Sequence, residues 1–152
     1  MLPESPTSAA RCAGVERSGL AWDAPAPFAP SQTLAEALMV PARIYIKSVL
    51  PLIKAGKIKA LAHITGGGLI ENPPRAIAEG LVPRFDWNAW TLPAVFAWLQ
   101  EAGGVAESEM RRTFNCGVGL SLIVAPEDAP PVLEGLLAGG EDAFVCGELA
   151  AA

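Results

Sequence analysis

The segment spanning residues 63–75 reads H-I-T-G-G-G-L-I-E-N-P-P-R and holds several groups that could bind an anion. Glycine has no Cβ, so Gly66, Gly67 and Gly68 can adopt positive φ values and turn backbone N–H groups toward a ligand. Thr65 can donate a hydroxyl, Asn72 can both donate and accept, and Arg75 can pair with two oxygens of an oxyanion. Together these groups predict a phosphate pocket.

The glycine triplet matches neither of the two common phosphate-binding patterns, G-x-G-x-x-G and G-x-x-x-x-G-K-[ST]. As a bare pattern, it fits a tight strand-to-helix turn without a ligand as well as it fits a phosphate loop. The apolar run before it, at 58–62, predicts a buried strand, and 76–78 predicts a short helix. The N-terminus of that helix would add unpaired donors and partial positive charge.

Three further residues could take part in chemistry. His63 is the only histidine, and its near-neutral pKa suits catalysis, although a lone histidine at a strand end is more often structural. Asn115 could position a substrate through its amide, or it could form a turn at a helix end. Cys116 has no neighbouring base, which favours a buried structural thiol over a nucleophile. The sequence predicts no metal site.

The elements that must position these groups alternate between strands and helices, which predicts a layered α/β or α+β domain. Ser31 or Thr33 would cap a helix over 34–39, and Gly56 would end another that starts at Ile46. Thr91 would cap a third helix. Strands are expected at 58–64, 81–85, 120–124 and 143–146, and further helices at 108–114 and from 127 onward.

The composition limits the classes of function that this protein can have. Hydrophobic residues make up 51% of the 152 residues and charged residues 18%, so part of the apolar surface is expected to face a neighbour. The net charge of −5 argues against a nucleic-acid surface. A local basic cluster fits a solvated helix edge better than a phosphate-steering patch; it comprises Arg43, Lys47, Lys54, Lys57 and Lys59. No apolar run reaches 18 residues, so we expect no membrane contact. The three cysteines lack C-x-x-C spacing, which indicates reduced thiols and a cytoplasmic protein.

The segment A-L-A-H-I-T-G-G-G-L-I-E-N-P-P-R resembles the signature of the second domain of phosphoribosylformylglycinamidine cyclo-ligase, also called aminoimidazole ribonucleotide synthetase. Further segments resemble that family in the same order: S-G-L-A-W-D-A-P-A-P-F at 18–28, P-A-R-I-Y-I-K at 41–47, A-W-L-Q-E-A-G-G-V at 97–105, R-T-F-N-C-G-V-G at 112–119 and A-F-V-C-G-E at 143–148. The resemblance is nearly continuous from Ser18 to Glu148. It implies an α+β fold with a mixed sheet flanked by helices over 18–152. Residues 1–17 depart from the family pattern and are expected to be poorly ordered.

The resemblance also implies a function. The family closes formylglycinamidine ribonucleotide to aminoimidazole ribonucleotide with ATP and Mg²⁺, a step of purine biosynthesis, and works as a homodimer. Its first domain, which carries most of the Mg-ATP site, has no counterpart here, so the isolated chain is expected to be inactive and to need that domain or a full-length homologue as partner. In this interpretation His63 lies in the active site, and Thr65, Gly66, Gly67, Gly68, Asn72, Arg75 and Asn115 bind substrate or phosphate. A non-catalytic or degenerate phosphate- or nucleotide-binding module, related to selenophosphate synthetase or thiamine monophosphate kinase, stays open as the alternative.

Overall fold

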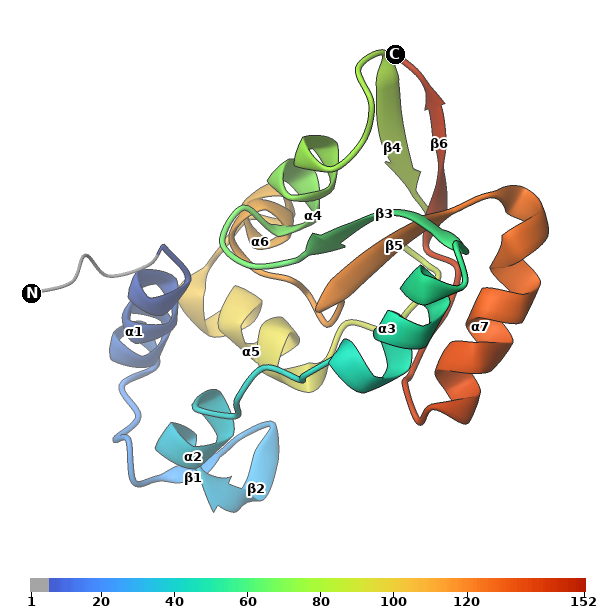
Figure 1. The fold of residues 1–152 in the computed structure, drawn as a ribbon. Helices are drawn as coiled ribbons and strands as arrows, with labels where there is room; N and C mark the ends of the chain where they lie inside the picture. Colours follow the sequence, from blue (N-terminus) through green and yellow to red (C-terminus); the bar gives the residue numbers. More distant parts are fainter. Residues whose placement is uncertain (1–5) are drawn as a thin grey trace, which may run out of the picture. The chain divides into compact units, whose positions relative to one another are not determined.

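The computed structural model describes residues 6–152 (Figure 1). The chain divides into two compact units, each built from three separate stretches. The first unit comprises the chain up to Ala42, Ile64–Glu71 and Leu92–Val118. The second comprises Arg43–His63, Asn72–Thr91 and Gly119–Ala152.

The first unit is mainly helical. Helix α1 (Pro6–Ser18) packs against α5 (Ala94–Gly103), and α4 (Gly68–Glu71) packs against α6 (Glu107–Thr113). Strands β1 (Pro25–Ala26) and β2 (Ala29–Thr33) form a short antiparallel pair that leads into α2 (Leu34–Leu38). Burial of apolar side chains holds the unit together, and its core contains Val15, Leu34, Leu38, Leu99, Met110 and Phe114.

The second unit holds two antiparallel strand pairs. Strand β3 (Ile58–His63) pairs with β5 (Leu120–Val124), and β4 (Leu81–Phe85) pairs with β6 (Gly147–Ala151). Helix α3 (Ile46–Lys54) lies against α7 (Ala129–Ala138) (Figure 1). Two short 3₁₀ helices complete the unit, η1 (Pro73–Arg75) and η2 (Pro126–Asp128).

The predicted α+β class is confirmed, and several local signals gave the right element. Thr33 caps α2 with a complete capping box, because its hydroxyl accepts from the Glu36 N–H while the Glu36 carboxylate accepts from the Thr33 N–H. Gly56, at φ +71°, follows the end of α3 as expected. The predicted strands at 58–64, 81–85 and 120–124 match β3, β4 and β5.

Residues 6–17, for which poor order was expected together with 1–5, belong to helix α1; residues 1–5 lie outside the described part of the chain, and the poor order of this segment stays a prediction. Other expectations were wrong. Residues 76–78 are not helical, because the helical turns fall earlier, in α4 and η1. The last strand is β6 rather than 143–146. Pro93, not Thr91, precedes the first turn of α5.

Candidate functional site

The glycine loop of residues 65–68 forms a tight turn in the first unit. Gly67 and Gly68 have φ values of +108° and +54°, so the loop uses the left-handed backbone that glycine permits. The Gly68 N–H donates to the Thr65 carbonyl at 2.9 Å, and the Glu71 N–H donates to the Gly67 carbonyl at 2.9 Å. Three of the loop's backbone groups, the Thr65 and Gly67 carbonyls and the Gly68 N–H, therefore serve to start α4, which is only four residues long.

Close packing explains the need for glycine at position 68. A Cβ atom there would lie 2.1 Å from the carbonyl oxygen of Arg111 and 2.7 Å from that of Phe114. Both distances are shorter than any tolerated contact, so the backbone of this loop approaches the end of α6 as only glycine allows. This contact gives Gly68 a structural role, whether or not the loop also binds a ligand.

Asn115 lies in the turn that follows α6, also in the first unit. Its side-chain oxygen accepts from the Gly117 N–H at 3.1 Å, and its carbonyl accepts from the Val118 N–H at 2.9 Å. Asparagine commonly stabilises turns in this way. The neighbouring Cys116 is buried, with φ +50°, and its thiol donates to the Met110 carbonyl at 3.4 Å. Burial raises the pKa of the Cys116 thiol to about 11, with a small opposing effect of Arg111, so the thiol stays protonated near neutral pH.

The other predicted site residues lie in the second unit. His63 is the last residue of β3, pairs with Leu120 of β5, and is exposed. Asn72 is buried and Arg75 is exposed, at the two ends of the turn that includes η1, where the Arg75 N–H donates to the Asn72 carbonyl at 3.2 Å. The predicted residues thus form two groups: Thr65, the three glycines and Asn115 in the first unit, and His63, Asn72 and Arg75 in the second.

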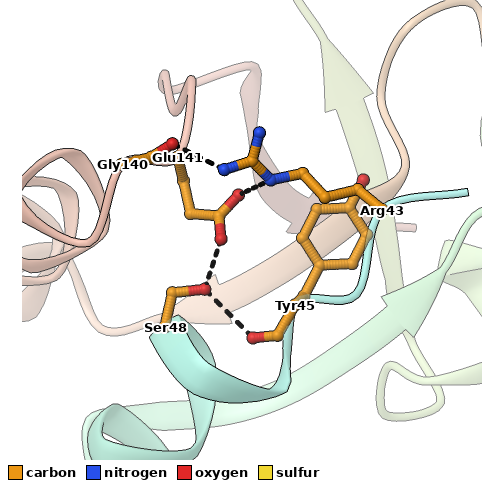
Figure 2. A network of polar contacts seen from close by, with 5 residues as sticks. All are labelled: Arg43, Tyr45, Ser48, Gly140 and Glu141. Atoms are coloured by element: carbon orange, nitrogen blue, oxygen red, sulfur yellow. Dashed lines mark hydrogen bonds and ion pairs between the residues drawn. The ribbon is translucent and has the colours of Figure 1, made fainter.

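A polar network holds the segment before α3 (Figure 2). The Glu141 carboxylate accepts from Arg43 Nε at 2.7 Å and from the Ser48 hydroxyl at 2.5 Å. Arg43 also donates to the Gly140 carbonyl at 2.6 Å, and the Ser48 hydroxyl contacts the Tyr45 carbonyl at 3.0 Å. The segment is thereby tied to the end of α7. Burial, and then the nearby Glu141, raise the pKa of the Tyr45 hydroxyl.

An open hollow of about 380 Å³ lies between α3 and β3 in the second unit. We call it the α3–β3 hollow; its lining includes Tyr45, Ile46, Leu50, Ile53, Leu61 and His63. The sequence predicted a helix that starts at Ile46 and ends at Gly56, but this surface was not predicted. The sequence did hold a signal for this surface. Three lysines lie around an apolar stripe, and no acidic residue is near them in the sequence.

The chemistry of the described residues sets limits on the site. Among residues 6–152, no group of three His, Cys, Asp or Glu side chains is placed to hold a metal ion. No helix in the described part of the chain is both long enough and apolar enough to cross a membrane.

The fold and the glycine loop define a class of protein: an α+β domain with small antiparallel strand pairs flanked by helices and a glycine turn after strand β3. The sequence matches the family described as AIR synthase related protein, C-terminal domain, over residues 6–152. The chain belongs to this family, whose members are generally parts of ATP-using enzymes. The match begins at residue 6 and therefore includes helix α1, which the resemblance at Ser18–Glu148 had left out.

Proposed function

We propose that this chain acts as the C-terminal domain of a phosphoribosylformylglycinamidine cyclo-ligase. The family match over residues 6–152 carries this proposal, because it spans both units and every predicted site residue. In the reaction, ATP phosphorylates the formamide oxygen of formylglycinamidine ribonucleotide. An amidine nitrogen then attacks the activated carbon, the ring closes and phosphate leaves, giving aminoimidazole ribonucleotide, ADP and phosphate.

In this proposal the chain binds the ribonucleotide and orients it for ring closure. In the first unit, Thr65 would bind phosphate oxygens and Asn115 would contact substrate. In the second unit, the exposed Arg75 would bind phosphate oxygens. His63 is proposed to lie in the active site, where it could bind a phosphate or polarise the formamide. Mg-ATP would be held mainly by a first domain of the family type, supplied by the same polypeptide or by a partner.

A second candidate is a phosphate- or nucleotide-binding module without ring-closing activity. The hydrogen bond from the Gly68 N–H to the Thr65 carbonyl engages that amide in a turn, which gives the glycine loop a structural role that does not require catalysis. The carbonyl oxygens of Arg111 and Phe114, which a Cβ at position 68 would overlap, also account for glycine there without a ligand. Under this alternative, the chain would bind nucleotide with a partner but would not support turnover.

Complementation separates the two candidates. We would mix the purified chain with a first domain from an AIR synthetase and measure ATP-dependent ring closure, with calorimetric titration of formylglycinamidine ribonucleotide in parallel. The cyclo-ligase proposal expects turnover only in the mixture. Binding without turnover would support the second candidate, whereas turnover by the chain alone would refute the need for a first domain.

Variants of single residues test which side chains belong to the proposed site. Arg75→Ala should reduce kcat/KM of the mixture by about 10- to 100-fold, the loss expected when a charged hydrogen bond to phosphate is removed. Arg84→Ala is the matched control, because Arg84 is also exposed and lies on β4 in the same unit. Equal activity of the two variants would remove Arg75 from the proposed site.

A further inference from the structure

The α3–β3 hollow is bordered by an unusual set of exposed aliphatic side chains. Ile46 is 66% exposed, Leu50 42%, Ile53 41% and Leu61 40%. Single exposed aliphatic residues are common on protein surfaces, but a contiguous group around a concavity marks an interaction surface. All four residues line the hollow, so they form one such group.

Helix geometry places a basic border beside this group. At about 100° per residue, Ile46, Leu50 and Ile53 share one face of α3, and Lys47 and Lys54 follow directly on one side of it. The opposite side of α3 packs on α7, where Leu52 approaches Gly135 and Ser48 approaches Gly139. The lysines therefore border the side of the apolar face that α7 does not cover.

Strand β3 contributes a third lysine. Lys59 is exposed and lies where the register of β3 shifts, between Ile58 and Ala60, just before Leu61 and His63, which line the hollow. Within residues 6–152, Lys47, Lys54 and Lys59 make no ion pair. By contrast, Lys57 of the same basic cluster pairs with Asp128 at 2.6 Å. Three cations that have no acidic partner among the described residues therefore lie on α3 and β3, the two elements that form the hollow, next to its lining residues rather than among them.

We propose that the α3–β3 hollow docks an amphipathic helix of a partner protein, with apolar side chains in the hollow and Asp or Glu side chains against Lys47, Lys54 and Lys59. The apolar spacing along α3 matches the i, i+3 or i+4, i+7 anchors by which helices occupy grooves. Carboxylates on the partner would complement the lysine border. This surface extends beyond the proposed function, because it does not depend on ring closure.

The observations favour a helix over two other occupants. A small lipid-like anion would need a pocket that encloses most of its surface, and this hollow is open, because five of its lining aliphatic residues are 40% exposed or more. A second copy docking through the same face would bring two lysine borders together, and like charges oppose each other. An acidic amphipathic helix can place apolar side chains against the apolar lining of the hollow and carboxylates against the neighbouring lysines.

The test uses a designed fluorescent peptide as the probe. It carries leucine at i, i+3, i+4 and i+7 with glutamate on the flanking positions, and a twin peptide replaces each glutamate by lysine. Fluorescence anisotropy should show binding of the acidic peptide and at least tenfold weaker binding of the twin. Leu50→Asp should weaken the acidic peptide at least tenfold, and Lys54→Glu several-fold, with the Lys54 effect shrinking as salt is raised.

Controls keep the result interpretable. Leu137→Asp introduces the same charge at an exposed leucine of α7 that does not line the hollow, and it should leave the affinity unchanged. If Leu50→Asp fails to fold, the Ile46→Ser variant takes its place. Hydrogen exchange of the unsubstituted protein is then also measured, and the acidic peptide should protect α3 and β3. The proposal is overturned if the acidic peptide does not bind, if both peptides bind equally, if laurate displaces the peptide, or if the chain self-associates through this face in ultracentrifugation.

Discussion

At the residue scale, Gly68 shows how one position can be required for packing. Gly68→Ala adds a Cβ within 2.1 Å of the Arg111 carbonyl oxygen, at φ +54°, so strain and overlap act together. We expect the free energy of unfolding to fall by about 3 kcal/mol. Gly56→Ala is the matched control, because Gly56 has φ +71° and no atom within 4 Å of its Cβ position. Its cost should be about 1 kcal/mol. Chemical denaturation measures both, and equal losses would contradict the packing argument.

Cys116 gives a prediction about reactivity. With its pKa raised to about 11 by burial, roughly one thiol in a thousand is ionised at about pH 8. Native protein treated with iodoacetamide should therefore be modified at the exposed Cys12 well before Cys116, as read by peptide mass spectrometry. In denaturant the two should react at similar rates. Rapid labelling of Cys116 in the native protein would mean that this thiol is accessible and activated.

At the element scale, the Glu141 network decides whether the segment before α3 is fixed. Glu141→Gln removes the carboxylate that binds both Arg43 and Ser48, and the Glu141 side chain is only 11% exposed. We expect a loss of about 1 kcal/mol in the free energy of unfolding and faster hydrogen exchange over residues 43–48. Glu134→Gln, at an exposed position of α7, is the control. Unchanged exchange in Glu141→Gln would show that the network does not hold the segment.

Elements with local signals could be predicted from the sequence. The Thr33 capping box and the apolar run of β5 each identify their element from adjacent residues. Strand β6 could not be predicted in this way, because it exists through pairing with β4, as in Phe85 opposite Gly147. The candidate site could likewise be predicted only in part. The contact that makes Gly68 necessary comes from carbonyls more than forty residues away, whereas Thr65 and Arg75 could be proposed from their types alone.

At the scale of the whole molecule, the order of the chain links the two units. The chain passes between them five times, at residues 42–43, 63–64, 71–72, 91–92 and 118–119. Neither unit is a continuous stretch, so neither can assemble before loops that contain parts of the other are closed. We therefore expect one cooperative unfolding transition for both units.

Tryptophan placement allows a direct measurement of this cooperativity. Trp22 and Trp98 belong to the first unit, and Trp87 and Trp90 to the second. A Trp22→Phe/Trp98→Phe variant reports on the second unit by fluorescence, and a Trp87→Phe/Trp90→Phe variant reports on the first. In urea, each variant should give the same midpoint by fluorescence as by far-ultraviolet circular dichroism, which follows the whole chain. If the fluorescence and dichroism midpoints separate within either variant, the units unfold independently despite the five crossings, and stability in one would not secure the candidate residues in the other.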